Sequence, residues 1–241
     1  RDQLVTQVGI KTFDDVFNFF NSAKDIWKKN ALSKCPNILK LYNILTEDSK
    51  ILQKEIQAFF TSYYDNKRDM VNKSEYHVNK LLYWDSQEEF IDTEPTPWEL
   101  LIQLTGFEKQ IQELGTLLKD NKEQIPASII IEFTAIDGIL KEGLKSLNAA
   151  LDIRSELVQW SSFIKSNYQN LTSLNSAPLK VNNFIYENLL QVYPGGVLCS
   201  ATLMVNDDFR YFGEKVGLDL AVIDHHVKER IYHSPFHYND Q

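Results

Sequence analysis

The stretch Thr96-Pro97-Trp98-Glu99 opens the run of sequence that decides the fold. Threonine suits a helix N-cap, proline suits the first helical position, and Glu99 stands where it completes a capping box with Thr96. Apolar residues then recur in alternating steps of four and three, which is a heptad seam: Leu100, Leu104, Phe107, Ile111, Leu114 and Leu118. The stretch therefore predicts a long helix that buries one apolar stripe.

A second helix is predicted directly after the first. The polar residues 120–122 break the seam, and Pro126 opens a new run with its own apolar stripe, which comprises Phe133, Ile136, Leu140, Leu144, Leu147 and Leu151. Two such helices joined by a short polar turn predict an antiparallel hairpin. The ordinary interpretation of both stripes is core packing rather than a cofactor site.

Two further amphipathic helices are predicted on the N-terminal side. Residues 12–31 and 36–64 carry apolar residues at helical spacing, Thr12 suits an N-cap, and Pro36 suits the first position of the second helix. The aromatic-rich residues 76–84 favour a strand.

The periodicity shifts from 3.6 toward two after residue 151. Residues 157–164 and 168–174 predict strands, residues 184–191 predict a helix, and a further helix is expected to end at Gly217. The fold class is therefore α+β and predominantly α-helical. We expect a helical domain over residues 1–150 and a smaller β-containing domain over residues 151–241.

Composition limits the classes of function. The formal net charge of -8 argues against a phosphate-binding surface that extends over the whole protein, although a local groove could be basic. Cys35 and Cys199 are too few for a disulfide framework or for an iron–sulfur cluster, which needs four ligands, so we expect two small buried side chains. No apolar run is long enough to span a bilayer and no signal peptide is evident, so a cytoplasmic protein with no membrane partner is expected.

A short apolar run near the C-terminus is followed by hydroxyl side chains. Gly195-Gly196-Val197-Leu198-Cys199 leads into Ser200-Ala201-Thr202-Leu203. Val197–Cys199 predicts a buried strand, and Ser200 and Thr202 then stand at its carboxyl end, where ligands bind in open α/β sheets. The alternative is an ordinary strand end capped by two hydroxyls.

Several short signatures in this region occur in a family's order and spacing. They are Cys199-Ser-Ala-Thr-Leu203, Phe209-Arg-Tyr-Phe212, Gly217-Leu218, Ser234-Pro-Phe-His-Tyr238 and Gln241. Together they resemble superfamily 2 helicases of the DinG/XPD type, in which a Thr-Ser-Ala-Thr-Leu box forms helicase motif III. The resemblance covers residues 178–241 by motif, about a quarter of the chain, and Cys199 departs from the family's usual threonine.

The resemblance implies an ATP-dependent DNA helicase or translocase. Residues 1–150 would correspond to the family's helical arch insertion, and residues 151–241 to a partial motor domain with the start of the second one. Ser200, Ala201 and Thr202 would couple the nucleotide site to the DNA track. Single-stranded DNA, ATP, Mg²⁺ and the rest of the helicase chain would be the partners and cofactors of the parent protein.

This chain has no phosphate-binding loop and no Asp-Glu-Ala-His box. We therefore expect a piece of a longer helicase that binds no cofactor and hydrolyses no ATP by itself. Its own role would be to guide or gate single-stranded DNA.

A candidate nucleic-acid site lies at the end of the helix predicted over residues 36–64. Tyr63 and Tyr64 could stack on bases, and Lys67 and Arg68 could contact phosphates. The alternative is a hydrated helix end whose tyrosines are satisfied locally.

Two other classes of function stay open. Leu104, Ile111 and Leu118 could face outward and pair between chains, which would make the protein a helical interaction scaffold. Asp224-His225-His226 matches three letters of the DHH phosphoesterase signature. His225, His226, His233 and His237 are better interpreted as polar side chains of a surface segment, so no metal site is predicted. The sequence does not determine the oligomeric state.

Overall fold

The structure is a computed structural model. It describes residues 5–21, 31–72, 80–84, 86–153, 156–165, 170–193, 195–200, 203–205, 208–218 and 228–231. The described chain divides into two compact units. The first, here called the helical unit, spans Val5–Ala177, and the second, here called the C-terminal unit, begins at Pro178.

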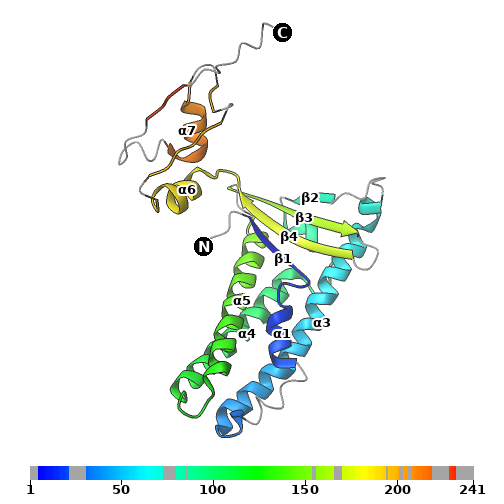
Figure 1. Cartoon of the computed structure of the whole chain (residues 1–241). Helices are drawn as coiled ribbons and strands as arrows, with labels where there is room; N and C mark the ends of the chain where they lie inside the picture. The colour runs from blue at the N-terminus through cyan, green and yellow to red at the C-terminus, as the bar shows by residue number, and fades with distance from the viewer. Residues whose placement is uncertain are drawn as a thin grey trace. The chain divides into compact units, whose positions relative to one another are not determined.

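In its described residues, the helical unit contains four α-helices and a four-stranded sheet (Figure 1). The helices are α1 (Asp14–Asn21), α3 (Pro36–Asn72), α4 (Pro97–Asp120) and α5 (Ala127–Leu151). α4 packs against α3 and α5, and α1 packs against α3 and α5. The protein is predominantly α-helical with a small sheet, so the predicted fold class is confirmed.

Helix α4 begins as its sequence predicts. The Thr96 backbone N–H donates to Glu99 Oε2 at 2.8 Å, and the Glu99 backbone N–H donates to Thr96 Oγ1 at 3.3 Å, which completes the capping box. The Glu99 carboxylate accepts hydrogen bonds from the Thr96 backbone N–H and from the Thr96 hydroxyl, and both lower the pKa of Glu99. The cap matters because the first N–H groups of a helix have no partner within the helix.

Replacing Thr96 with alanine is expected to lower the free energy of unfolding by about 1 kcal/mol, because one N–H group of α4 loses its acceptor. Thr116→Ala is the matched control, since Thr116 lies in the same helix and its hydroxyl only donates back to the Gln112 carbonyl. Alanine is the better helix former there. A urea titration of both variants checks the difference, and equal losses would contradict the role of the cap.

The heptad seam of α4 is buried inside the helical unit. Leu104 and Ile111 are 0% exposed and Leu118 is 2% exposed. The outward-facing seam expected of an interaction scaffold is therefore wrong for this structure, because α5 and α3 already cover these side chains. The partner stripe on α5 is likewise buried at Phe133 and Leu140.

Two aromatic clusters fill the interior between the helices. The first joins α1 to its neighbours through Phe13, Phe17, Phe19, Phe20, Tyr42, Phe107 and Phe133. The second lies between α3 and the sheet and contains Phe59, Phe60, Tyr63, Trp84, Phe90, Trp98 and Phe163. Aromatic rings at centroid distances of about 4.5 to 7 Å stabilise a core beyond the area that they bury.

The sheet has the strand order β1-β4-β3-β2. The strands are β1 (Thr6–Gly9), β2 (Lys80–Trp84), β3 (Leu157–Lys165) and β4 (Asn170–Pro178). β1 pairs antiparallel with β4, and β2 pairs antiparallel with β3. The strand predicted over residues 157–164 is confirmed. Of the strands expected in residues 168–174 and 76–84, the described parts, 170–174 and 80–84, are strands. The participation of residues 6–9 was not predicted.

The predicted helices differ from the structure at their ends. α1 begins at Asp14, and residues 22–30 of the expected helix lie outside the described residues. α3 continues to Asn72, past the predicted end at residue 64, and within this extension Asn66 donates to the Asp92 carbonyl and Lys67 pairs with Glu89. A short 3₁₀ turn, η1 (Gln87–Phe90), occupies part of the acidic loop after β2.

The boundary between the two compact units lies after Ala177 rather than near residue 150. β3 and β4 belong with the helices because their pairing partners are β2 and β1. The C-terminal unit therefore begins where the motif-bearing span of the sequence begins.

The C-terminal unit contains α6 (Asn182–Ile185), the π-helical turn η2 (Tyr186–Leu190) and α7 (Arg210–Val216). Gly217 ends α7 with a φ of 77°, which confirms the predicted stop. A side chain at this position would be strained, and an added Cβ would lie 2.4 Å from the Asn182 carbonyl oxygen. Glycine thus allows α7 to pack against α6.

Candidate functional site

The run that was expected to form a buried strand is exposed and is not a strand. Val197 is 90% exposed, Leu198 is 48% exposed, and residues 195–200 have neither helical nor strand structure. Ser200 is also exposed, whereas Ala201 and Thr202 lie outside the described residues. The predicted strand is therefore wrong for this chain, and Ser200 does not stand at the end of a sheet strand.

The physical reason is that a strand requires a neighbour for its backbone N–H and C=O groups. Among the described residues, none in the four-stranded sheet pairs with residues 195–200. The nearest β-type pairing along the chain is a single bridge between Val205 and Asp208. Apolar sequence alone does not form a strand when no pairing edge is available.

The second candidate site, which lies in the C-terminal part of α3 and not at its end, is a buried polar junction. Tyr63 is 0% exposed, and its hydroxyl donates to Glu89 Oε1 at 2.9 Å. The Tyr63 hydroxyl oxygen also lies 3.0 Å from Ser161 Oγ on β3. A carboxylate can only accept hydrogen bonds, so the single phenolic proton is directed at Glu89. Tyr63 therefore cannot serve as the exposed base-stacking ring that was predicted.

The other three residues of this predicted site differ in exposure. Lys67 pairs with Glu89 at 3.0 Å, with little of either side chain exposed, and Lys67 Nζ lies 5.9 Å from the centre of the Tyr63 ring. Tyr64 is half-buried against the Phe163 ring, and Arg68 is exposed. Only Arg68 keeps an exposed side chain of the kind that a phosphate contact would need.

The junction joins three elements: α3 through Tyr63 and Lys67, η1 through Glu89, and β3 through Ser161. Burial raises the pKa of Tyr63 above its ordinary value of 10.0, and the Glu89 carboxylate raises it further. A phenol held in its protonated form is a poor general base. The arrangement therefore favours a structural lock between helix and sheet over acid–base chemistry.

No sequence pattern indicates this junction beyond the presence of Tyr63 and Lys67. Glu89 and Ser161 lie 26 and 98 residues from Tyr63 along the chain. Glu89 belongs to an acidic stretch that is typical of a solvated loop, and Ser161 is one of two adjacent serines in a strand. Only tertiary packing brings these groups together.

The wild-type protein is expected to lose stability as the pH rises above 10.0, and Tyr63→Phe is expected to remove the part of this loss that Tyr63 causes. Below pH 10.0 both the folded and the unfolded state keep the phenolic proton, but above it the unfolded state ionises while buried Tyr63 stays protonated. The native state then binds more protons, so stability falls with rising pH by up to about 1.4 kcal/mol per pH unit from this group. Urea titrations at several alkaline pH values measure the slope.

The exposed Tyr193 offers the matched control, as Tyr193→Phe changes a ring that is 54% exposed. The quantity compared is the slope of the free energy of unfolding against pH. The contribution of Tyr63 is the difference in this slope between the wild-type protein and Tyr63→Phe, after subtraction of the change in slope seen in Tyr193→Phe. If Tyr63→Phe and the wild-type protein lose stability in parallel above pH 10.0, Tyr63 is not the buried phenol described here.

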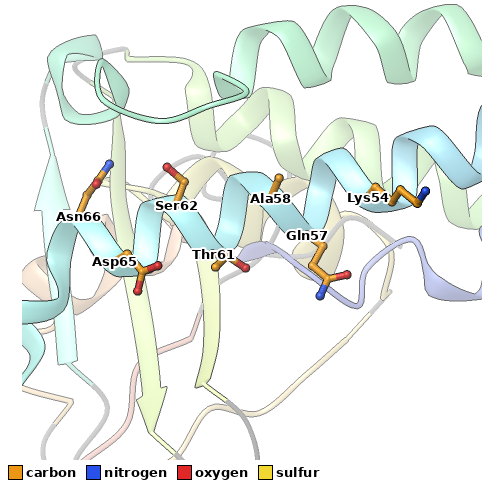
Figure 2. A pocket seen from close by; sticks show the side chains of 7 residues that line it. All are labelled: Lys54, Gln57, Ala58, Thr61, Ser62, Asp65 and Asn66. Atoms are coloured by element: carbon orange, nitrogen blue, oxygen red, sulfur yellow. The ribbon is translucent and has the colours of Figure 1, made fainter.

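An open groove of about 610 Å³ runs along the outer side of α3 (Figure 2). It is lined by side chains from successive turns of that helix: Lys54, Gln57, Ala58, Thr61, Ser62, Asp65 and Asn66. The lining contains one cation and one carboxylate, and the Asn66 amide already donates to the Asp92 carbonyl at 2.8 Å. Such a surface is polar and weakly charged, and it has no concentration of groups suited to a specific reaction.

Both cysteines were predicted to be buried, and the structure confirms this for one of the two. Cys35 is buried, with Sγ 3.6 Å from Gln124 Oε1, whereas Cys199 is exposed, which corrects the expectation for the second cysteine. Both thiols are free. His225, His226, His233 and His237 lie outside the described residues.

Within the described ranges, no group of three or more histidine, cysteine, aspartate or glutamate side chains is placed to hold a metal ion. In the same part of the chain, no helix has the length and apolar character needed to cross a bilayer. Comparisons of the chain with family models and with curated protein sequences give no match.

Proposed function

We propose that this chain is the arch-like and motif III region of an ATP-dependent DNA helicase of the DinG/XPD type. The observation that carries the proposal is the ordered set of signatures between residues 178 and 241, from the Ser-Ala-Thr-Leu box to the Ser-Pro-Phe segment. Each signature alone is short, but their order and spacing together are far more specific than any one of them.

The division of the chain supports the same proposal. The motif-bearing span coincides with the C-terminal unit, which begins at Pro178, and a separate unit of long helices precedes it. This is the arrangement expected when a helical insertion is followed by the return of the chain into a motor domain. β3 and β4 are neighbouring strands of the helical unit, so the insertion would include the small sheet.

The nucleotide would be held by other parts of the parent helicase. The chain contains no glycine-rich phosphate loop with its lysine and no Asp-Glu-Ala-His box, so its residues do not fit ATP and Mg²⁺. The part that this chain would contribute is Ser200, Ala201 and Thr202. Hydroxyl groups suit coupling between two sites because they can exchange hydrogen-bond partners without a change of charge.

The exposed run before Ser200 has a direct explanation under this proposal. Val197 and Leu198 would become a buried strand when the sheet of the motor domain supplies neighbours on both sides. Cys199 lies in the same run and carries a thiol that can report on this burial.

Reading the coding sequence upstream of Arg1 tests the proposal most directly. A phosphate loop followed by an acidic-histidine box is the expected result, and an upstream region without either would overturn it. The protein that includes this region should show ATP hydrolysis stimulated by single-stranded DNA.

Thiol labelling provides a second test. Cys199 is expected to react rapidly with a maleimide in this chain alone and slowly in the protein that contains the upstream motor region. Buried Cys35 is the internal control and should react slowly in both. Rapid labelling of Cys199 in both proteins would contradict formation of the motif strand.

The guiding role is tested separately by mixing this chain with labelled single-stranded DNA at low and high salt. Binding that weakens with salt is expected, since phosphate contacts release counterions. No binding at low salt would remove the guiding role. Sedimentation over a range of concentrations should show a monomer, because the heptad seam that could pair between chains is buried.

A further inference from the structure

We draw no further inference here: the strongest candidate, the surface patch of Tyr83 and Trp160 on the face of the sheet away from α3, carries none because nothing in the structure shows what covers it.

Discussion

Replacing Phe20 with alanine is expected to lower the free energy of unfolding by about 3 to 5 kcal/mol. The Phe20 side chain is 0% exposed. Its ring centroid lies 5.0 Å from that of Phe19, 5.5 Å from that of Tyr42 and 5.8 Å from that of Phe107, which links α1 to α3 and α4. The substitution removes both the buried apolar area and the ring contacts, and the surrounding helices can refill the cavity only in part.

Urea unfolding followed by circular dichroism measures this effect. Ile102→Ala is the matched control, since Ile102 is an apolar side chain of α4 that is 72% exposed. Its substitution should change stability by no more than about 0.5 kcal/mol. A loss below about 1 kcal/mol in Phe20→Ala would show that α1 is not packed into the core as described.

Gly143→Ala is expected to destabilise the protein by about 1 to 3 kcal/mol, although alanine is normally the better helix former. Gly143 lies in α5, and a Cβ added there would stand 2.3 Å from Phe13 Cε1. Phe13 is 1% exposed and packs against Phe17, so its ring has no free space to occupy. The extra methyl group must therefore push α1 and α5 apart.

Gly138→Ala supplies the control in the same helix. Nothing lies within 4 Å of a Cβ added at Gly138, so this substitution should raise stability by up to about 1 kcal/mol through helix propensity alone. The sign of the effect should therefore differ between two glycines five residues apart. Stabilisation by both substitutions would contradict the close packing of α1 on α5.

The sequence by itself predicts the elements whose signals are local. The capping box at Thr96, the heptad seam of α4, the stripe on α5 and the stop at Gly217 all depend on residues a few positions apart, and the structure confirms each of them. The strand period in residues 157–164 is equally local. The expectation that Cys35 is a small buried side chain is also met.

What the sequence could not determine is which distant segments meet. Val197–Cys199 has the composition of a buried strand, yet it is exposed, because strand formation depends on a pairing edge that the described sheet does not offer it. The sequence pattern of Tyr63 is that of an exposed aromatic residue at a helix end. In the structure it is buried, and its hydroxyl contacts Glu89 and Ser161, which lie far away along the chain.

The tertiary structure therefore decided the two candidate sites, and it did so for one physical reason. Helix caps and heptad stripes are satisfied within a few turns of the chain, whereas a strand edge and a buried hydroxyl depend on partners from other segments. The sequence determined a helical protein with a small sheet. Tertiary packing determined that Tyr63 locks that sheet to α3 and that Tyr83 remains exposed on its outer face.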